Sequence, residues 1–467
     1  MSSNESSTPH TCDFFIPSKG VPGEILGTMM QKEMAGDIPP SQDLGRFTTT
    51  KFDGVAINLM DISGTRNQAC IEEYPSLARF QENCVAILAN LWKAPHNFFG
   101  TATTGSSEAV LLGGLTMKRQ WQLKNPDRQN TRPNVLIGAN AHICVRKFAD
   151  YFDVEAKIIP VNERTRYTFD VMSLEENLDG NTIGVFLTLG STYTGHYDPL
   201  QRVSEILDEY ERRTGNNIPI HVDAASGGLI TPFTSSNETF VWDFRLSRVQ
   251  SINVSGHKYG MAPLAVGWMI WREKSQIPQN LLLESSYLRG THANFTLTFS
   301  RSGAPIAGQY YNFHRLGISG YRDWVHTLLD RARLLSIWLE DTGYFHCLSD
   351  AHRQLLSNGI ISNSADGHHT RCHENDQAAV PGLPIVVFTF ADRVRQQYPR
   401  LRLSDVSDSM HDLKFSIPSY TLHGWGAQGE DIDVMRIVLR DEMTVELMAE
   451  VLKNVIHVVE ELIDQPY

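Results

Sequence analysis

Residues 251–260 read SINVSGHKYG, an apolar run that ends in a turn of small residues carrying His257 and Lys258. Similar short runs of β-branched and apolar residues lie before and after it, at 133–139, 154–161, 182–190, 218–225 and 265–271. Helical patterns separate several of these runs, as in HICVRKFADYF (142–152) and LQRVSEILDEYERRTG (200–215). Apolar strands that alternate with helices predict an α/β fold with a mainly parallel sheet covered on both faces. Ligands of such a sheet gather at the carboxyl ends of its strands.

Changes in composition and in hydrophobic periodicity divide the chain into three parts. Residues 1–45 are rich in Ser, Pro and Gly and predict an extended or frayed N-terminal arm. Residues 46–328 form the predicted large domain, and a long helix that begins near residue 320 leads into a smaller α+β domain at 329–467. Within this small domain, the polar and aperiodic stretch 358–381 predicts a surface loop, and 441–463 predicts an amphipathic helix.

Composition narrows the class of protein. The 467 residues include 41 Lys and Arg against 53 Asp and Glu, a formal net charge of −12, which disfavours binding to nucleic acid. No stretch reaches the roughly 18 apolar residues of a membrane span, and the N-terminus lacks the apolar core of a secretion signal. The six cysteines show no CxxC spacing and suit a reducing compartment. We therefore expect a cytoplasmic protein without nucleic-acid or membrane partners.

Two strand ends carry residues that suggest chemistry. Lys258 follows one strand, where desolvation would lower its pKa and favour the neutral amine that forms an imine. Asp223 ends another strand in IPIHVDAASGG, where it could pair with a protonated heteroaromatic nitrogen while Ala225 leaves room for the ring. Each residue alone has a simpler explanation. The lysine could be a solvated turn residue, and the aspartate could be a helix N-cap or a metal ligand.

A third segment, GTATTGSSEAVLLGGLTMKRQW (100–121), places small residues before a helix. Hydroxyls and free backbone N–H groups at Gly105, Ser106 and Ser107 would converge where the helix dipole favours an anion. An ordinary serine N-cap followed by Glu108 would look similar. Taken together, however, a phosphate site, a carboxylate for a ring nitrogen and an imine-forming lysine are the set that one cofactor requires.

These three segments, as G-S-S-E-A, H-V-D-A-A-S-G-G and S-G-H-K-Y-G, resemble the signatures of the pyridoxal-phosphate-dependent group II decarboxylases, and of glutamate decarboxylases in particular. The similarity extends through EEYPSLARFQ, LTLGSTYTGHYDP, FTLTFSR and DVMRIVLR in the order of that family, over most of residues 40–445. The resemblance implies the aspartate-aminotransferase-like fold (fold type I), with pyridoxal 5'-phosphate as cofactor.

The resemblance also implies which residues hold the cofactor ring. Lys258 would carry the cofactor as an imine, and Asp223 would pair with the pyridinium nitrogen. Thr192 would bond near the ring, and His142 would stack on the face of the ring at a position that many glutamate decarboxylases fill with Gln.

The phosphate group and the assembly follow from the same resemblance. Ser106, Ser107 and His257 would bind the phosphate, and Ser300 of FTLTFSR would reach it from the partner subunit. A site shared in this way implies a homodimer or a higher homo-oligomer.

On the substrate side, Arg436 of DVMRIVLR would take the α-carboxylate of the amino acid, because a guanidinium binds a carboxylate with two hydrogen bonds. Thr50 and Asn67 match positions that bind the distal carboxylate of glutamate. Tyr287, on the mobile loop of the family, would help to reprotonate Cα. The predicted reaction is the decarboxylation of L-glutamate to 4-aminobutyrate.

Two departures from the family pattern leave the substrate open. Cys70 stands where glutamate decarboxylases commonly carry Asp, and Arg289 replaces a glycine of the loop motif Y-L-G-G. Both changes alter charge close to the expected substrate position, so aspartate, cysteine sulfinate or a related acidic amino acid remains an alternative. Transamination or another reaction of the same cofactor also stays open, and so does a dimeric scaffold without activity.

Two further motifs are expected to carry no function. Gly424, Gly426 and Gly429 spell GxGxxG, but the following DIDVMRIVLR predicts a strand, whereas a dinucleotide fingerprint requires a helix. HHTRCH (368–373) lies in the aperiodic loop without a second half, so we expect no metal site there.

Overall fold

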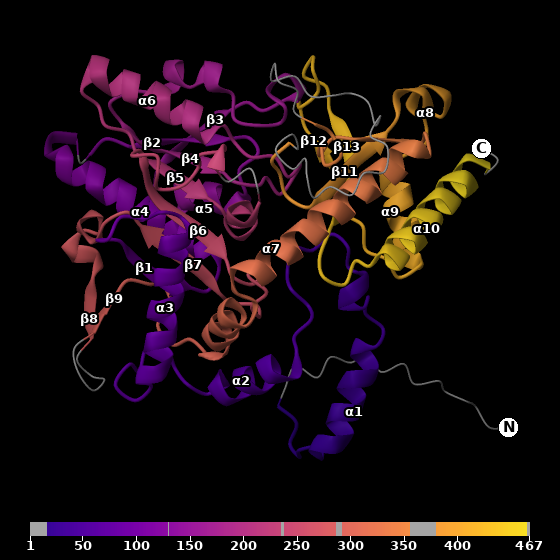
Figure 1. Cartoon of the computed structure of the whole chain (residues 1–467), viewed down its shortest axis with the longest axis horizontal. Coiled ribbons are helices and arrows are strands. Elements are labelled where there is room, and N and C mark those ends of the chain that lie inside the picture. Colours follow the sequence, from indigo (N-terminus) through magenta and orange to yellow (C-terminus); the bar gives the residue numbers. More distant parts are fainter. Residues whose placement is uncertain (1–15, 129, 235–237, 286–291, 355–379, 465–467) are drawn as a thin grey trace.

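A computed structural model describes residues 16–464 except residue 129 and the stretches 235–237, 286–291 and 355–379 (Figure 1). Within these residues no helix is both long and apolar enough to cross a membrane. Two sheets with their surrounding helices account for most of the described chain, and the long helix α7 (Ala304–Asp341) runs from one to the other (Figure 1).

The larger sheet has seven strands in the order β1-β7-β6-β5-β4-β2-β3. Neighbouring strands from β3 to β6 are parallel, whereas β7 runs antiparallel to both β6 and β1. The prediction of a mainly parallel sheet is therefore confirmed. The strands are β1 (Phe99–Thr103), β2 (Asn134–Gly138), β3 (Glu155–Ile159), β4 (Thr182–Thr188), β5 (Ile220–Asp223), β6 (Val249–Ser255) and β7 (Gly267–Trp271).

Helices cover both faces of this sheet, which explains why its central strands are buried and mostly apolar. Every residue of β2, β4 and β5 is buried. In β2, Val135 and Ile137 join a core cluster with residues of α4 and α5, whereas Leu136 between them belongs to the main cluster on the other face. The helices of this region are α3 (Pro75–Leu91), α4 (Ser106–Lys124), α5 (Ile143–Tyr151) and α6 (Leu200–Thr214).

The smaller sheet is antiparallel throughout and has the order β10-β11-β13-β12. Its strands are β10 (Phe345–Cys347), β11 (Ile385–Phe390), β12 (Ser419–Leu422) and β13 (Ile432–Val438), and the helices around it are α8 (Asp392–Gln397), α9 (Leu403–Asp412) and α10 (Val445–Asp464). The strand predicted after the GxGxxG motif is confirmed as β13. The predicted terminal helix is confirmed as α10.

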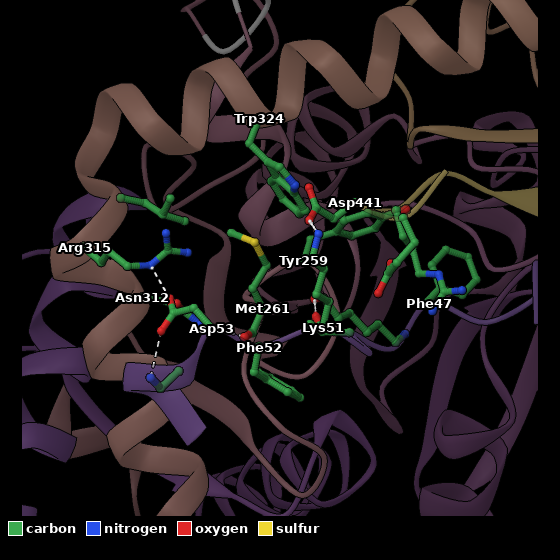
Figure 2. A pocket seen from close by; sticks show the side chains of 16 residues that line it. Phe47, Lys51, Phe52, Asp53, Tyr259, Met261, Asn312, Arg315, Trp324 and Asp441 are labelled. Carbon is green, nitrogen blue, oxygen red and sulfur yellow. Dashed lines mark hydrogen bonds and ion pairs between the residues drawn. The ribbon is translucent and has the colours of Figure 1, made fainter. Parts of the chain in front are cut away.

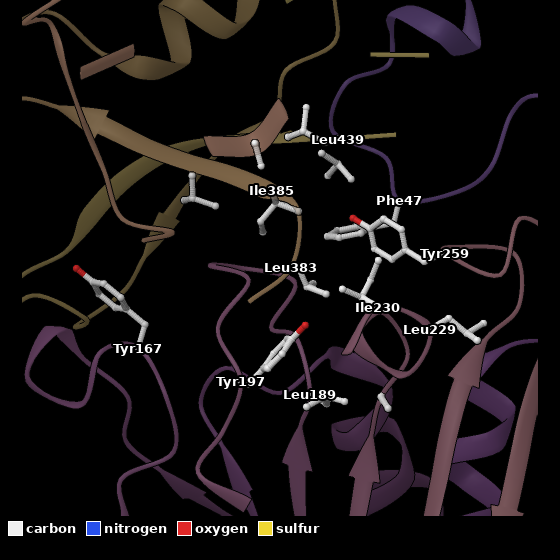
Figure 3. Packing of buried hydrophobic residues seen from close by; sticks show 14 of the residues in the cluster. Phe47, Tyr167, Leu189, Tyr197, Leu229, Ile230, Tyr259, Leu383, Ile385 and Leu439 are labelled. Atoms are coloured by element: carbon white, nitrogen blue, oxygen red, sulfur yellow. The ribbon is translucent and has the colours of Figure 1, made fainter. Parts of the chain in front are cut away.

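The two sheets share one hydrophobic core. Figure 3 shows where Leu383 and Ile385 from the small sheet approach Leu189 and Tyr197 from the segment that follows β4. The hydroxyl of Tyr197 donates to the carbonyl of Gly382 over 3.1 Å, and this bond fixes the two segments to each other. The predicted domain boundary at residue 328 falls inside α7, and the division into domains stays a prediction.

The N-terminal region contains more regular structure than the sequence pattern indicated. The predicted arm contains the helix α1 (Gly23–Met34), of which no residue is buried, and α2 (Gly54–Gly64) follows it and packs on α7. Residues between the two helices pair with the small sheet, since the Val438 amide donates to the Leu44 carbonyl over 2.8 Å. A ribbon of β8 (Leu283–Ser285) and β9 (His292–Asn294) completes the described strands.

Candidate active site

The carboxyl ends of three parallel strands border a cavity of about 280 Å³. Thr188, Asp223 and Ser255 are the last residues of β4, β5 and β6, and all three line the cavity. The N-terminus of α4 forms another part of its wall through Ser106. The structure brings eight of the predicted cofactor residues to this wall: Ser106, Ser107, His142, Thr192, Asp223, Ala225, His257 and Lys258. Ser300 is the ninth and does not line the cavity.

The start of α4 is built to present polar hydrogens to the cavity. Gly105 precedes the helix with φ 152, a backbone conformation that side chains rarely allow. Ser106 accepts a hydrogen bond of 2.8 Å from the Ser255 hydroxyl, so its own proton stays free for an anion. Glu108 fixes the loop from behind by accepting from the Thr104 amide over 2.7 Å and from its hydroxyl over 2.8 Å. The arrangement suits a phosphate group.

His257 lies beside this helix start with one ring nitrogen already used. Its Nδ1 lies 2.8 Å from the Val266 carbonyl, which can only accept a hydrogen bond, so Nδ1 carries the proton. Burial and the neighbouring Lys258 cation lower the pKa of His257 to about 4. In this state the ring is neutral, and Nε2 must gain a proton before it can donate to an anion.

Asp223 is buried and has one carboxylate oxygen to spare. Its Oδ1 accepts from the Asn253 side-chain amide over 2.9 Å and from the Ala225 backbone amide over 3.2 Å. Both hydrogen bonds that it accepts in the described part of the chain go to this oxygen, which leaves Oδ2 for a donor inside the cavity. A buried carboxylate with a free oxygen favours a positively charged partner.

Lys258 supplies the amine. Its Nζ lies 3.3 Å from the Ser226 hydroxyl and 5.2 Å from the centroid of the Phe47 ring. Burial lowers the pKa of Lys258, the Asp223 carboxylate opposes this effect, and the Arg436 cation adds to it. A lowered pKa increases the fraction of neutral amine, the form that attacks a carbonyl carbon.

His142 and Thr192 complete the wall that faces the amine. His142 caps α5, and its Nδ1 accepts from the Cys144 amide over 3.3 Å. Burial lowers the pKa of His142, so the ring is present as a flat and uncharged surface at neutral pH. The carbonyl of Thr192 accepts a hydrogen bond of 2.5 Å from Arg436, which joins the wall to the small sheet.

Arg436 lies on β13, next to the cavity but outside its lining. One terminal nitrogen donates to Thr192, and the other donates to the Gly45 carbonyl over 2.7 Å. Its Cζ lies 5.0 Å from the centroid of the Phe47 ring. A guanidinium has five N–H groups, so these two contacts leave donors for a carboxylate.

The other predicted substrate residues lie away from this cavity. Thr50 donates its hydroxyl to the Glu442 carboxylate, and neither Thr50 nor Asn67 lines the cavity. The Asn67 side-chain amide donates to the Ser300 hydroxyl over 3.1 Å, so these two predicted residues lie together. Ser300 is exposed. Tyr287 and Arg289 lie outside the described residues.

The sequence motif HHTRCH also lies outside the described residues. Among the residues that the structure does describe, no group of three His, Cys, Asp or Glu side chains could hold a metal ion.

Comparison with known proteins identifies the family. Residues 47–358 match the family model described as the pyridoxal-dependent decarboxylase conserved domain. The chain belongs to the pyridoxal-dependent decarboxylases. It is 34% identical to the glutamate decarboxylase of Saccharomyces cerevisiae over 452 residues, which cover 93% of this chain and 76% of that protein. It is 36% identical to the glutamate decarboxylase of Aliivibrio fischeri over 416 residues, which cover 88% of this chain and 82% of that protein.

Solved structures of other proteins share the fold. The glutamate decarboxylase of Lactobacillus brevis superposes with a TM-score of 0.85 at 30% sequence identity, covering 97% of this chain and 96% of that one. A sphingosine-1-phosphate lyase from Burkholderia pseudomallei shares the fold with a TM-score of 0.74 at 19% identity, covering 97% and 94% of the two chains. The predicted fold type I is therefore confirmed.

The residues around the cavity fit pyridoxal phosphate, the cofactor of this decarboxylase family. Its phosphate matches the free Ser106 proton at the start of α4, and its ring nitrogen matches the unused Oδ2 of Asp223. Its aldehyde requires an amine, which Lys258 provides at the same cavity. The Asp223 carboxylate raises the pKa of Lys258 against the larger effect of burial, which lowers it.

The decarboxylase has a second cavity next to the first, of about 330 Å³, and Lys258 is the one lining residue that both share. Figure 2 shows this second cavity, with Asp53, Arg315 and Asp441 among its lining residues. Charged side chains that line this second cavity form ion pairs with one another. The Arg315 guanidinium lies 3.2 Å from the Asp53 carboxylate, and the Lys51 amine lies 3.8 Å from that of Asp441. Lys258 therefore lies between a cavity whose wall suits a phosphate group and a cavity with a charged wall.

Several residues of the decarboxylase site were not predicted from sequence. Phe47 contacts both Lys258 and Arg436, Ser226 contacts the lysine amine, and Asn253 contacts Asp223. Asn253 could have been found from its place, because an amide inside the apolar strand SINVS requires a buried partner. Phe47 carries no such signal, since its segment RFTTTK shows no periodicity.

Proposed function

We propose that this decarboxylase removes the α-carboxylate of L-glutamate to give 4-aminobutyrate and CO2. The observation that carries the proposal is the meeting of the Lys258 amine, the free oxygen of Asp223 and the phosphate site of α4 at one cavity. The substrate assignment rests on the relatives, because the proteins that are 34% and 36% identical over most of the chain are named glutamate decarboxylases.

Pyridoxal phosphate, when bound, supplies an electron-poor ring that accepts the electron pair left behind when a carboxylate departs. Asp223 maintains this property by holding a proton on the ring nitrogen through its Oδ2. Lys258 would hold the cofactor through its amine, and the same amine would move a proton at Cα once the substrate is bound. His142 would pack against a face of the ring, and Ala225 would leave space for it. Ser106, Ser107 and His257 hold the phosphate.

Arg436 orients the substrate in this proposal. Its remaining N–H groups would bind the α-carboxylate and hold the scissile bond perpendicular to the ring. The backbone bonds to Thr192 and Gly45 fix the guanidinium, so little conformational entropy is lost when the substrate binds. Tyr287, which the family resemblance suggests as the proton donor to Cα, would act with Lys258.

The distal carboxylate of glutamate would be bound by residues near the subunit boundary. In this proposal Asn67 still binds the distal carboxylate, together with the segment around Ser300, whose hydroxyl accepts a hydrogen bond from the Asn67 side-chain amide. Thr50 can offer a carboxylate no proton while its hydroxyl donates to Glu442. Cys70 lies in the same turn as Asn67, since the Cys70 amide donates to the Asn67 carbonyl over 3.0 Å. A charge at position 70 would therefore act on whichever substrate Asn67 binds.

We propose that the active unit is a homodimer in which Asn67 and Ser300 serve the site of the partner subunit. Neither residue lines the cavity of its own chain. Close to them in the chain, apolar side chains are exposed to solvent on α2 (Val55, Ile57, Ile62) and at Leu297, and α1 exposes further ones (Ile25, Leu26, Met29, Met30, Met34). A second copy of the chain would cover such side chains and complete both sites.

We also propose a cytoplasmic location. The four cysteines that the structure describes, Cys70, Cys84, Cys144 and Cys347, are all free, as a reducing compartment would keep them.

Product analysis tests the proposed reaction. The purified enzyme with cofactor should release CO2 and 4-aminobutyrate from glutamate in equal amounts without a keto acid. A keto acid product would indicate transamination instead. The protein should absorb visible light, and borohydride should fix the cofactor on Lys258. A protein that stays colourless and unlabelled after cofactor is added would contradict every enzymatic assignment.

Substrate choice requires a separate experiment. Aspartate and cysteine sulfinate assayed beside glutamate, on the parent and on Cys70→Asp, show whether position 70 selects the substrate. A faster reaction with either competitor would overturn the assignment of glutamate.

A further inference from the structure

A chain of buried polar side chains runs along strands β5 and β6 behind the cofactor cavity. The Ser251 hydroxyl lies 2.7 Å from His221 Nδ1, His221 Nε2 lies 2.7 Å from Asn253 Oδ1, and Asn253 Nδ2 lies 2.9 Å from Asp223 Oδ1. The four side chains are at most 3% exposed. The strands are paired so that His221 is opposite Ser251 and Asp223 is opposite Asn253. The chain of hydrogen bonds thus crosses between the strands and leads to the carboxylate.

The donors in this chain all point the same way. Asn253 donates its amide hydrogen to Asp223, so its carbonyl oxygen is the atom that faces His221 and can only accept. His221 Nε2 must then carry the ring proton, and Nδ1 must accept from the Ser251 hydroxyl. Burial lowers the pKa of His221 to about 4 against the opposing charge of Asp223, so the ring is neutral at neutral pH. A neutral ring has one donor and one acceptor, as this order requires.

Packing holds the His221 ring in this orientation. The Phe186 ring lies with its centroid 4.7 Å from that of His221. The helix α4 passes over the ring at Gly113, where a Cβ atom would lie 2.8 Å from His221 Nδ1. Only a glycine at this position lets the helix approach so closely. The imidazole therefore has no room to turn away from Ser251 and Asn253.

The far end of the chain borders a different cavity. Ser251 and Gly113 line a space of about 360 Å³, together with Gln250, Gln276 and Trp271. This space lies at the side of the sheet where β4 and β6 begin, whereas the cofactor cavity lies where they end. Ser251 can thus be changed without touching a residue that lines the cofactor cavity.

We propose that His221 and Asn253 are positioning residues for the ring nitrogen of the cofactor: they keep Asp223 ionised, with Oδ1 occupied and Oδ2 turned to the ring, and Ser251 sets the direction of the chain. The proposal rests on the proposed function, because it takes Asp223 as the partner of the ring nitrogen. Hydrogen bonds donated to a carboxylate stabilise its charged form, and aligned donors strengthen one another. A charged Asp223 leaves the proton on the ring nitrogen, and the ring stays electron-poor.

A purely structural role for these side chains makes a different prediction. If the chain only satisfied buried polar groups, the loss of the Ser251 hydroxyl would lower stability and leave the bound cofactor unchanged. In our proposal the same loss leaves His221 Nδ1 without a donor and weakens the donation to Asp223, so the charge on that carboxylate is less well stabilised. The proton then moves from the ring nitrogen toward Asp223, although Ser251 touches neither.

The test compares Ser251→Ala with Ser251→Thr and with Gln276→Ala. Threonine restores a hydroxyl, and the cavity beside position 251 has room for its methyl group. Gln276 lines the same cavity but bonds to Gln250 rather than to the chain, so its substitution controls for changes to the cavity. Three quantities are measured on each protein: the midpoint of the pH titration of the visible band, the dissociation constant of the cofactor and kcat.

We expect the Ser251→Ala protein to bind the cofactor about 2- to 10-fold more weakly and to lose kcat by a similar factor, the range of one lost hydrogen bond. The midpoint of the visible titration should rise, by up to about one pH unit, because a less positive ring nitrogen favours the protonated form of the Lys258 nitrogen bonded to the cofactor. Ser251→Thr and Gln276→Ala should behave like the parent in all three measurements.

Other results would overturn the proposal. A Ser251→Ala protein with parental midpoint and cofactor affinity would show that the chain does not act on Asp223, and so would equal shifts in all three variants. A parent protein that binds no cofactor or releases no CO2 would instead refute the proposed function, so the two failures are distinguishable. Ser251 is chosen because substitutions of the fully buried His221 could prevent folding.

Discussion

The amine of Lys258 lies 5.2 Å from the centroid of the Phe47 ring. The guanidinium carbon of Arg436 lies 5.0 Å from the same centroid, so one aromatic ring contacts the two cations on which catalysis depends in our proposal. An aromatic ring attracts cations through its electron-rich face and excludes water from them. The N-terminal segment, which forms little of the core, thereby becomes part of the proposed active site.

Replacing Phe47 by Leu should lower kcat/KM by about 2- to 30-fold, the range expected for the loss of cation–π contacts. The cause is a less well-fixed Arg436 and a more hydrated Lys258. Steady-state kinetics with glutamate measure the effect. Phe47→Tyr keeps the aromatic ring and should retain most of the activity. A leucine variant with parental kinetics would mean that the ring serves only packing.

Mixed dimers test the sharing of sites. A Lys258→Ala chain lacks the amine, and an Asn67→Ala, Ser300→Ala chain lacks the residues proposed to serve the partner, so each homodimer should be nearly inactive. When the two chains are co-expressed, about half of the dimers are mixed, and one of their two sites has both sets of residues intact. We expect about a quarter of the parental activity. The absence of any recovery in verified mixed dimers would assign Asn67 and Ser300 to their own subunit or to no site.

The protonation state of His257 leads us to expect that the protein takes up a proton when it binds the cofactor. Its pKa is lowered to about 4 by burial and by Lys258, and its Nδ1 proton is bonded to Val266. Donation from Nε2 to a phosphate therefore requires a proton from solution. Binding of pyridoxine 5'-phosphate, which has no aldehyde to react with Lys258, should take up more protons in the parent than in His257→Gln.

Calorimetry at pH 8 in buffers of different ionisation enthalpy measures this difference, because the phosphate is already doubly ionised there. Since the bound state holds the extra proton, the affinity of the parent should fall as the pH rises, and that of His257→Gln should fall less. Equal uptake in both proteins would contradict donation from His257.

Glu340, near the end of α7, should contribute to the free energy of unfolding in a way that depends on pH. Burial raises the pKa of Glu340, but hydrogen bonds from His352 and the Cys347 amide, with the Arg353 charge, outweigh it and lower the pKa to about 2 from 4.5. A carboxyl with a lowered pKa stabilises the fold above its unfolded value, near 4.5, and loses this effect as the pH falls toward 2.

Glu340→Gln should therefore lower the free energy of unfolding by about 1 to 3 kcal/mol at pH 7. Denaturant unfolding should show a constant difference from the parent above about pH 5 and a smaller one below pH 4.5. A difference that stays the same down to pH 4 would show that the charge is not the cause.

The central part of the fold follows from the sequence because its physical signals are local. The strands β2, β4 and β5 are buried along their whole length and consist mostly of apolar residues, as cover on both faces requires, and the aspartate at the end of β5 and the lysine just after β6 indicate where the cavity lies. The strand β1 was missed, since FGTAT has only one large apolar residue and owes its place to pairing with β7. The predicted start of α7 was late because Gly317 interrupts the helical pattern with φ 60.

The candidate site was less predictable where partners come from distant segments. Phe47 and Lys258 are in contact although they lie more than 200 positions apart in the chain. A hydrophobic pattern in the sequence cannot predict such a contact. Thr50 was predicted as a substrate residue from its position in a motif, but its bond to Glu442 depends on how two distant segments fold together. Motif matching identifies residue types, and tertiary packing decides which of their atoms remain free.

Glu108 joins two regions that would serve different sites. One carboxylate oxygen holds Thr104 at the phosphate loop, and the other accepts from the Leu297 amide over 2.8 Å in the segment that leads to Ser300. A phosphate that orders the Thr104 loop in one subunit would thus also order the segment from Leu297 to Ser300, which in our proposal serves the site of the partner subunit. In a dimer built this way, the first molecule of cofactor would prepare the second site, loading would be cooperative, and half-loaded dimers would be scarce.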